Sequence, residues 1–389
     1  MDFDREEESG IPVAGTGKVK RMKSTGKRIV VGLSGGVDSS IAAWLLKRDG
    51  WTVTGLTMSI WDGSVPILDE GMSGCFGPGE ARDLEAAKEI AARIGIEHRV
   101  IPLAEEYKRT VLDYFREEYL AGRTPNPCVR CNQRMKFGFL LEQARAQGLE
   151  FDKFATGHYA RVGFDEANGR WQLLRGRDGG KDQSYFLSRL KQDQLSGLVF
   201  PLGELLKGEV KDIARQLGWG DLAERDESQD FIECEDYSVL FRLGDARPGD
   251  FVTRGGEVLG RHRGIIHYTV GQRKGLELGG GGTPWYVLEI DAARNRVVVG
   301  PREDLYSRGL VADDLNWVAM AVPPEQPIHC EVQIRQRHRA AAATVSADGE
   351  RMNVLFDEPQ LSVTPGQIAV FYDGDKVLAS GVIGKPPRI

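Results

Sequence analysis

The chain has 389 residues, 28% of them charged, and a formal net charge of −6, a length that predicts two or three domains with ordinary apolar cores. The acidic balance excludes a protein coated with basic surface for non-specific nucleic-acid binding, although local basic patches stay possible. No apolar run approaches the roughly 20 residues of a membrane-spanning helix, and the acidic first residues do not resemble a secretory signal, so we expect a cytoplasmic protein outside the membrane.

Strand and helix patterns alternate over the first 200 residues. Residues 1–25 mix charge, Gly and Ser without apolar periodicity, and we expect a disordered tail there. The apolar run 28–33 predicts a buried strand, and the next segment has apolar residues at helical spacing. The alternation continues with a strand at 52–58, a helix at 80–96, a strand at 98–103 and a helix at 110–122. This order predicts an α/β domain over residues 26–200, with a parallel sheet covered on both faces and ligands at the carboxyl ends of its strands.

A different pattern follows residue 200. Residues 201–278 contain one short helical pattern, at 207–219, and Gly-rich turns, so we expect a small central linker domain. Short alternating apolar runs separated by turn residues fill residues 279–389 and predict a C-terminal β-barrel.

The turn after the first strand carries the string VVGLSGGVDSS, residues 30–40. Ser34, Gly35 and Gly36 let the backbone approach an anion closely, and the following helix presents N–H groups and a partial positive charge to it. The string lacks the Lys-Ser/Thr ending of the Walker motif, so it does not predict the usual γ-phosphate site of an NTPase.

The complete S-G-G-x-D-S string resembles the PP-loop of the N-type ATP pyrophosphatases, which cleave ATP between the α and β phosphates and transfer AMP to a carbonyl oxygen. The resemblance implies a site for ATP and Mg²⁺, in which Asp38 would hold the magnesium or orient the β-phosphate. Met58, at the end of the next strand, would contact the adenine through its backbone; the alternative is a core side chain. The loop residues implied in ATP binding are Gly32, Leu33, Ser34, Gly35, Gly36, Val37, Asp38, Ser39 and Ser40.

Five further strings narrow the family: GRTPNPCVRCNQRMKF, ATGHYARV, KDQSYFL, ESQDFIECEDY and HYTVGQRKGLELGG. They occur in the order and rough spacing of the tRNA-specific 2-thiouridylases, and this resemblance extends from about Arg28 to the C-terminus. It implies an enzyme that adenylates O2 of the wobble uridine of tRNA and replaces this oxygen with sulfur.

The same resemblance implies roles for single residues. Gly157 would contact ATP, and the target base would meet Asn126, Pro127 and Cys128. Contacts to the tRNA are implied for Lys181, Asp182, Gln183, Arg335 and Gln336. The alternatives are an ordinary hydrophilic turn at 181–183 and a solvated strand face that carries Arg335 and Arg337.

The expected partner is the anticodon stem-loop of a tRNA. A wobble base must be splayed out of its loop to reach a nucleotide-activating pocket, and proteins read such bases by edge contacts and stacking. Basic clusters at KVKRMK, RHRG, GQRKG and RQRHR could supply the phosphate contacts in an otherwise acidic protein.

The cysteine pattern does not decide how sulfur is delivered to the target base. The chain has five cysteines, and a reducing compartment argues against a disulfide framework. Many family members carry Asp at the position of Cys128, and their later thiol falls where this chain has Ile232, two residues before Cys234. The family's two-cysteine route would make Cys234 a persulfide carrier and Cys131 the thiol that releases the sulfur.

A second route uses three thiolates. Cys128, Cys131 and Cys234 resemble the ligands of iron–sulfur-dependent tRNA thiolases, where a 4Fe-4S cluster with one open iron binds hydrosulfide. This route is favoured here, with hydrosulfide or a persulfide-carrying protein as sulfur donor. Zinc held by the three thiolates with His158 or Cys75 is the structural rival. Two rival functions stay open, an amide-forming PP-loop ligase and a metal-stabilised RNA-binding module with a vestigial ATP loop.

Overall fold

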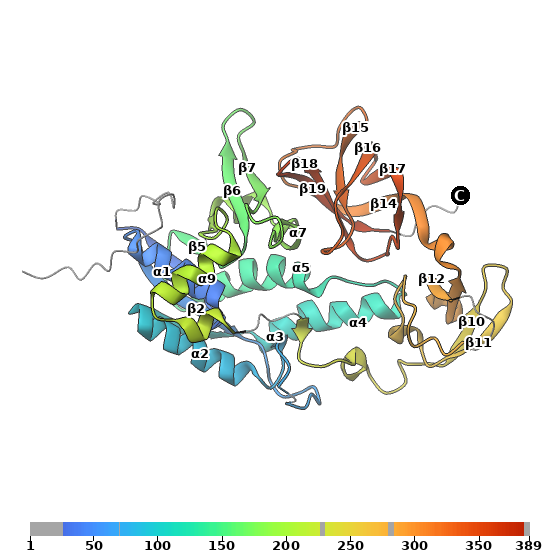
Figure 1. Cartoon of the computed structure of the whole chain (residues 1–389), viewed down its shortest axis with the longest axis horizontal. Coiled ribbons are helices and arrows are strands. Elements are labelled where there is room, and N and C mark those ends of the chain that lie inside the picture. Colours follow the sequence, from blue (N-terminus) through green and yellow to red (C-terminus); the bar gives the residue numbers. More distant parts are fainter. Residues whose placement is uncertain (1–25, 70, 226–229, 279–283, 385–389) are drawn as a thin grey trace, which may run out of the picture.

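Three parts follow one another along the chain in the computed structural model, which describes residues 26–69, 71–225, 230–278 and 284–384 (Figure 1). The first carries a five-stranded parallel sheet, the second a four-stranded sheet and the third a closed barrel. The tail expected at 1–25 lies outside the described residues. Within the described ranges, no helix is long and apolar enough to cross a membrane.

The parallel sheet has its first strand at the centre. Ile29, Val30 and Val31 of this strand are at most 1% exposed, as expected for a strand with both faces covered. The chain goes from this strand to one side of the sheet and later returns to the other side, so its carboxyl end is a topological switch point, where α/β sheets bind ligands. The order is β4-β2-β1-β5-β8, with β1 (Arg28–Gly32), β2 (Thr52–Ser59), β4 (Glu97–Pro102), β5 (Lys153–Ala155) and β8 (Leu198–Val199), all paired in parallel.

Helices cover both faces of this sheet. Ile29 and Val31 pack against α1 (Val37–Arg48), α2 (Glu80–Ile94), α9 (Lys207–Gln216) and α10 (Gly220–Ala223). Val30 points the other way, into a cluster built from α3 (Ala104–Tyr107), η1 (Lys108–Leu112), α4 (Asp113–Leu120), α5 (Pro127–Cys131), η2 (Asn132–Phe139) and α6 (Leu140–Ala146). Segments η1 and η2 are π-helical, a geometry that is frequent at functional sites. The predicted α/β fold is confirmed.

The middle sheet contains two strands that the sequence pattern assigned to the barrel. Residues 286–300 form β12 (Tyr286–Asp291) and β13 (Arg296–Gly300), which join β10 (Gly249–Val252) and β11 (Val258–His262) in the order β11-β10-β13-β12. Strand β13 pairs in parallel with β10, and this pairing attaches the β12–β13 hairpin to the middle sheet. The domain limits 26–200, 201–278 and 279–389 themselves stay predictions.

The barrel has six strands and is closed by the pairing of its first strand with its last. Its order is β14 (Tyr306–Trp317), β17 (Arg351–Leu361), β16 (Ala341–Asp348), β15 (Ile328–Gln333), β18 (Ile368–Asp373) and β19 (Lys376–Ile383). Alternate residues of β17 are buried, as a barrel wall requires. The hairpin of β6 (Ala160–Asp165) and β7 (Arg170–Arg175) continues the sheet beyond β19, where Leu174 pairs with Lys376. The predicted C-terminal barrel is confirmed.

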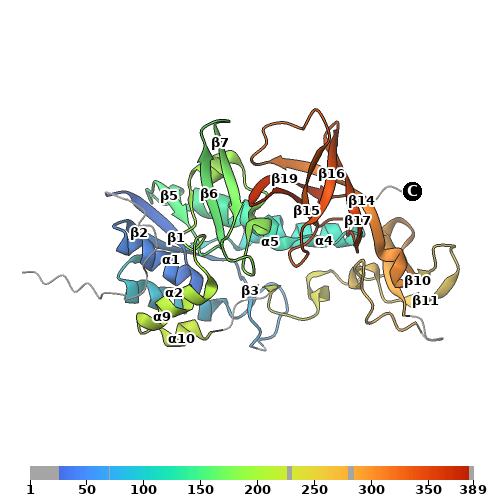
Figure 2. The same ribbon diagram turned by 45° about the horizontal axis from the view of Figure 1, so that its top comes forward.

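Contacts from the barrel hold the segment that leads into α5. The Gln367 side chain donates hydrogen bonds to the carbonyls of Thr124 and Pro125, each at 3.0 Å, and Thr124 N donates to the Pro365 carbonyl at 2.8 Å. Figure 2 shows α4 and α5 running beneath the barrel. The barrel therefore positions residues of the first part of the chain.

Candidate ATP and sulfur-transfer site

The loop after β1 ends in an open helix N-terminus. Helix α1 begins at Val37, and its N-cap residue, Gly36, has no side chain to accept the first N–H groups. Ser39 and Ser40 direct their hydroxyls to the Gly36 carbonyl, at 3.2 and 2.7 Å, and the Ser34 and Ser39 hydroxyls lie 3.2 Å apart. N–H groups without a side-chain cap, together with the helix dipole, favour an anion at this position.

Gly35 allows the loop to pass close to α2. Its φ is +73°, and a Cβ at this position would lie 2.8 Å from the Cβ of Ala86. Glycine adopts this conformation without steric cost, whereas other residues do not. Leu33 and Val37 on either side are buried and anchor the loop in the core. The predicted ATP-loop residues thus form one continuous turn at the switch point of the sheet.

Asp38, the predicted magnesium ligand, is paired within the protein. Both of its oxygens accept hydrogen bonds from the Lys207 ammonium, at 2.7 and 2.8 Å, and one also accepts from the Tyr159 hydroxyl at 2.8 Å. Arg225 comes to the same loop and donates to the Gly35 carbonyl at 3.2 Å. Two cations from later parts of the chain therefore lie at the loop.

Gly157 lies directly against the start of α1. A Cβ on Gly157 would approach Ser39 N to 2.6 Å and the Asp38 carbonyl carbon to 2.7 Å. The predicted adenine contact, Met58, lies on β2, half-buried against the apolar cluster that contains Val30. The structure therefore places Gly157 at the loop, and both proposed roles of Met58 are compatible with its position.

The C-x-x-C pair lies on the short helix α5. The Asn126 side chain caps this helix by accepting a hydrogen bond from Val129 N at 3.1 Å, and Pro127 occupies the first helical position, where it needs no donor. Cys131 is 7% exposed, and burial raises its pKa to about 12. Burial also raises the pKa of Cys128 to about 12. Both thiols are therefore protonated at neutral pH in this conformation.

The 156–158 loop lies between the ATP loop and η2, the helical segment that directly follows the thiol helix α5. While Gly157 touches α1, the His158 ring lies 5.9 Å from the Phe137 ring of η2, measured between ring centroids. Burial lowers the pKa of His158 to about 3, with a further decrease from the Lys136 charge. His158 is therefore neutral, and it lies between the two sites as a packed residue bonded to the Thr156 hydroxyl at 2.7 Å.

The thiols do not form the three-cysteine metal site that the sequence favoured. Within the described ranges, no group of three or more His, Cys, Asp or Glu side chains could hold a metal ion. Cys234 follows β9 (Asp230–Ile232), and its pKa is raised to about 11 by burial and by the charges of Asp236 and Asp230. Cys75, on β3 (Gly74–Phe76), and not Cys234, contributes to the raised pKa of both Cys128 and Cys131. The 4Fe-4S and zinc hypotheses therefore gain no support, because the donors are not assembled.

Within the turn at residues 181–183, Asp182 and Gln183 bond to other groups of the protein. Asp182 accepts hydrogen bonds from Gly176 N and Ser184 N, both at 3.0 Å, and lies 3.3 Å from an Arg175 nitrogen. The Gln183 side chain accepts a hydrogen bond from Tyr159 N at 2.9 Å. These contacts fix the turn before α7 (Ser184–Leu187), and the tRNA contacts of Lys181, Asp182 and Gln183 stay a prediction.

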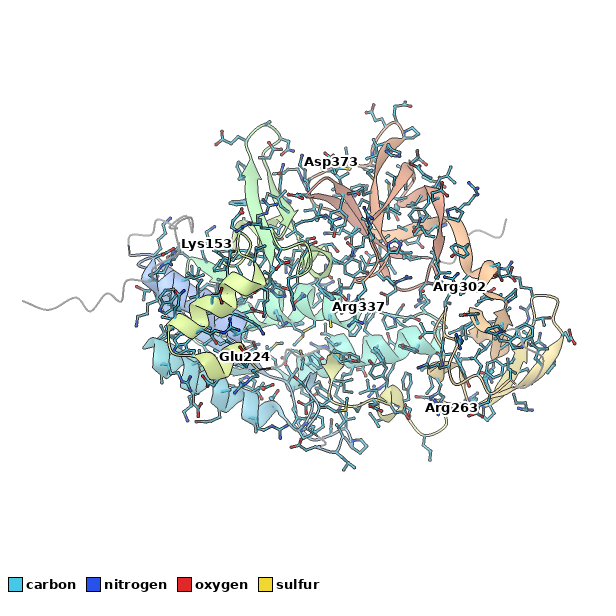
Figure 3. All side chains as sticks on the ribbon, in the orientation of Figure 1. Lys153, Glu224, Arg263, Arg302, Arg337 and Asp373 are labelled. Atoms are coloured by element: carbon cyan, nitrogen blue, oxygen red, sulfur yellow. The ribbon has the colours of Figure 1, made fainter. Side chains whose placement is uncertain are left out.

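Arg335 and Gln336 lie in the loop between β15 and β16. Arg335 is half-buried and donates to the Leu361 carbonyl at 3.1 Å, while Gln336 is exposed. Figure 3 shows Arg337 of the same loop at the end of the barrel that faces α4 and α5. Burial raises the pKa of Tyr185, and smaller effects on it come from Asn126 and Arg335. Asn126, before Cys128, and Arg335, in the barrel loop, thus both act on Tyr185, although tRNA binding by this loop stays a prediction.

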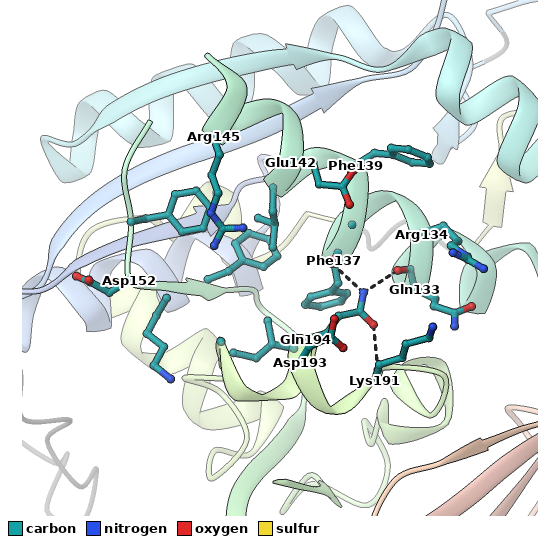
Figure 4. A pocket seen from close by; sticks show the side chains of 17 residues that line it. Gln133, Arg134, Phe137, Phe139, Glu142, Arg145, Asp152, Lys191, Asp193 and Gln194 are labelled. Carbon is teal, nitrogen blue, oxygen red and sulfur yellow. Dashed lines mark hydrogen bonds between the residues drawn. The ribbon is translucent and has the colours of Figure 1, made fainter. Parts of the chain in front are cut away.

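A cavity of about 350 Å³ is lined by residues of η2 and α6, and its wall includes Phe137 and Phe151 (Figure 4). The Gln194 amide in its wall donates to the carbonyls of Gln133 and Phe137, at 3.0 and 2.8 Å, and Lys153 donates to the Ser196 carbonyl. The Gln194 amide is thus already bonded to the protein, and none of the predicted site residues lines the cavity.

Lys207 and Tyr159 were missed as site residues by the sequence analysis, and Cys75 was considered only as an alternative zinc ligand. Lys207 lies 169 residues after Asp38, in a helical segment with no motif that links it to the loop. Tyr159 belongs to the ATGHYARV string, so its proximity to Gly157 could have suggested it. Cys75 precedes α2 in a Gly-rich segment, and only the pairing of β3 with β9 brings its segment beside the strand before Cys234.

Comparisons with known proteins identify the family. Three family models match in succession: a tRNA methyl transferase HUP domain at 27–234, a tRNA methyl transferase PRC-barrel domain at 238–301 and an aminomethyltransferase β-barrel domain at 307–383. A tRNA-specific 2-thiouridylase MnmA of Endomicrobium trichonymphae is 46% identical over 92% of this chain and 99% of its own, and one of Geobacter metallireducens is 46% identical over 92% and 96%.

A further relative, the tRNA-specific 2-thiouridylase MnmA of Nostoc punctiforme, is 43% identical over 92% of this chain and 99% of its own. A solved 4-thiouridine synthetase in complex with RNA is 13% identical, covers 52% of this chain and 44% of its own, and has a TM-score of 0.31, a likeness too low to support an argument. The similarity to the curated relatives, in contrast, extends over almost the whole chain and includes the ATP loop and the C-x-x-C helix. The chain belongs to the family of the tRNA-specific 2-thiouridylases.

Proposed function

We propose that the protein catalyses the ATP-dependent 2-thiolation of the wobble uridine of tRNA in the cytoplasm. The observation that carries this proposal is the 156–158 loop, which contacts the ATP loop through Gly157 and, through His158, lies against Phe137 of η2, the helical segment that directly follows the thiol helix α5. An activation site and a thiol pair on neighbouring elements suit a reaction in which a nucleotide carbonyl is first adenylated and then attacked by sulfur. The curated relatives, whose names describe 2-thiouridylases, support the same reaction.

In the first step, the loop from Gly32 to Ser40 would bind the phosphates of ATP at the N-terminus of α1, and Mg²⁺ would bind with them beside Asp38. The O2 atom of the uracil would attack the α-phosphate, so pyrophosphate would leave and AMP would remain on the oxygen. Helix α1 would stabilise the charge that develops on the phosphates.

In the second step, we propose the persulfide route. A donor transfers sulfur to Cys234, the outer sulfur of this persulfide attacks C2 of the activated base, and AMP leaves with the original oxygen. The Cys131 thiolate then attacks the Cys234 sulfur, which frees the 2-thio group and leaves a Cys131–Cys234 disulfide that a thiol reductant opens. Both residues pack against the same apolar cluster, which supports a meeting of the two thiols after a local rearrangement.

The tRNA would lie across the barrel loop and the segment before α5. Asn126, Pro127 and Cys128 are proposed to meet the target base, while Arg335 and Gln336, and the 181–183 turn, contact the anticodon stem-loop. The hydrogen bond from Gln367 to the Thr124 carbonyl supports this arrangement, because it fixes the barrel beside the residues proposed to meet the target base.

The test supplies purified protein with ATP, Mg²⁺, a sulfide or persulfide donor and an unmodified tRNA with uridine at the wobble position. We expect release of AMP and pyrophosphate, together with the mass change of an oxygen-to-sulfur exchange at that uridine. A tRNA with cytidine at the wobble position is the matched control and should release neither. A methyl mass increase that depends on a methyl donor and not on ATP would overturn the proposal and favour the reaction named in the family-model descriptions.

A further inference from the structure

The ATP loop contains no cation of its own. Residues 32–40 include one acid, Asp38, and neither Lys nor Arg. ATP brings about four negative charges to a helix N-terminus worth roughly half a positive charge, so a carboxylate in the same turn would oppose its binding. A positive group from elsewhere in the chain is needed to offset these charges.

Lys207 provides a cation at the required place. Its ammonium contacts both Asp38 oxygens, at 2.7 and 2.8 Å, and only 11% of its side chain is exposed. Asp38 itself is less enclosed, with 27% of its side chain exposed. The ammonium is therefore held at Asp38, in the first turn of α1.

The start of α9 is built to keep Lys207 in this position. Lys207 N donates to Asp178 at 2.8 Å, and the preceding residue, Leu206, donates its N–H to the Glu209 side chain at 2.7 Å. Val210, one turn further along α9, is fully buried and belongs to the same apolar cluster as Ile41 of α1. The backbone at Lys207 is thus fixed, while its four-carbon side chain keeps rotatable bonds that would let the ammonium move by a few ångström.

We propose that Lys207 is a phosphate-binding cation of this site, which Asp38 holds in place until ATP binds. On binding, the ammonium would turn from the carboxylate to the β- or γ-phosphate, and the released carboxylate would take the Mg²⁺ that accompanies the nucleotide. The exchange keeps each charge paired in both states, so neither a lysine nor an aspartate is left uncompensated in a largely buried place.

The competing explanation is a structural ion pair that only joins α9 to α1. The two explanations differ in what the charge recognises. A phosphate-binding cation contributes to the affinity for ATP and not to the affinity for adenosine, which has no phosphate. A structural pair affects both ligands equally, because its loss would displace the whole loop.

The experiment measures binding of α,β-methylene ATP with Mg²⁺, and of adenosine, by titration calorimetry with the full chain. Lys207→Met, which keeps the length of the side chain but not its charge, should weaken binding of the ATP analogue about 10- to 100-fold, the range for a lost hydrogen bond to a charged group. Adenosine binding should stay within about twofold of the unsubstituted chain. Lys207→Arg keeps the charge and should recover part of the analogue affinity.

Lys211, one turn further along α9 and half-buried, is the matched control, and Lys211→Met should leave both affinities unchanged. Equal losses for the analogue and adenosine in Lys207→Met, or no loss for either, would overturn the proposal. The inference rests on the proposed binding of ATP at this loop, which the unsubstituted chain tests separately. If that chain binds no analogue, the proposed function fails with it, whereas normal binding by both chains refutes only the role of Lys207.

Discussion

Gly157→Ala tests whether the contact between the 156–158 loop and the ATP loop is required for activation. The change adds one methyl group, whose carbon would lie 2.6 Å from Ser39 N and 2.7 Å from the Asp38 carbonyl carbon. Ordinary contact begins at 3.4 Å, so the loop must move by the difference of about 0.8 Å. Both neighbours are backbone atoms of α1, so neither can rotate away as a side chain would.

We expect this overpacking to cost about 1–3 kcal/mol of folding stability. We also expect ATP-dependent AMP transfer to fall about 100-fold, because a displacement near 1 Å is enough to disturb a reacting geometry. Thermal unfolding measures the first effect, and tRNA-dependent pyrophosphate release measures the second.

Gly163→Ala on β6 is the matched control, since a Cβ there meets no atom within 4 Å. It should unfold and react like the unsubstituted chain. Normal pyrophosphate release by Gly157→Ala, with an unchanged unfolding temperature, would show that the loop tolerates the shift and that its contact with α1 is not needed.

Four further outcomes are expected. Asp38→Ala should abolish AMP transfer. It should also lower the free energy of unfolding in urea by about 2 kcal/mol, because it leaves the enclosed Lys207 ammonium without its carboxylate. Adding Lys207→Met should restore most of that stability but no activity, and an unchanged stability of the single variant would count against the ion pair. Arg335→Ala should make the slope of log tRNA affinity against log salt concentration shallower by about 0.7 to 0.9. Arg351→Ala, which removes the partner of Asp313, should leave this slope unchanged. An unaltered slope for Arg335→Ala would exclude a phosphate contact. Cys128→Ala should keep appreciable thiolation, whereas Cys131→Ala and Cys234→Ala should lose it. All three variants should release pyrophosphate normally. An inactive Cys128→Ala enzyme that has also lost bound iron would support the iron–sulfur cluster route instead. Since burial raises the pKa of Cys131 to about 12, its alkylation rate should rise about tenfold per pH unit between about pH 8 and 10. A rate that levels off above about pH 9 would mean an exposed, ordinary thiol.

The sequence predicted those features whose cause is local. The strand, the Gly-rich turn and the helix that build the ATP loop are adjacent in the chain, so their pattern indicates both structure and chemistry. The barrel was predicted from short alternating runs, but alternation is the same for a strand of any sheet, and β12 and β13 were therefore assigned to the barrel instead of the middle sheet.

Features that depend on distant residues could not be predicted. The Lys207–Asp38 pair joins residues 169 positions apart, and no periodicity encodes it. The three-cysteine site was inferred from resemblance and spacing, which show neither that Cys234 follows β9 without joining a metal-binding group of side chains nor that β9 pairs with the strand of Cys75.

The hydrogen bonds that hold Thr124 and Pro125 have a consequence for how the protein matures during synthesis. Their partners, Pro365 and Gln367, lie between β17 and β18 and leave the ribosome long after the parallel sheet is complete. Domains generally fold in the order of their synthesis, so the ATP loop would form early while the segment before Cys128 waits for the barrel. A nascent or C-terminally truncated chain would then bind nucleotide before its thiols are in position, and the barrel would be the last component to make the enzyme competent.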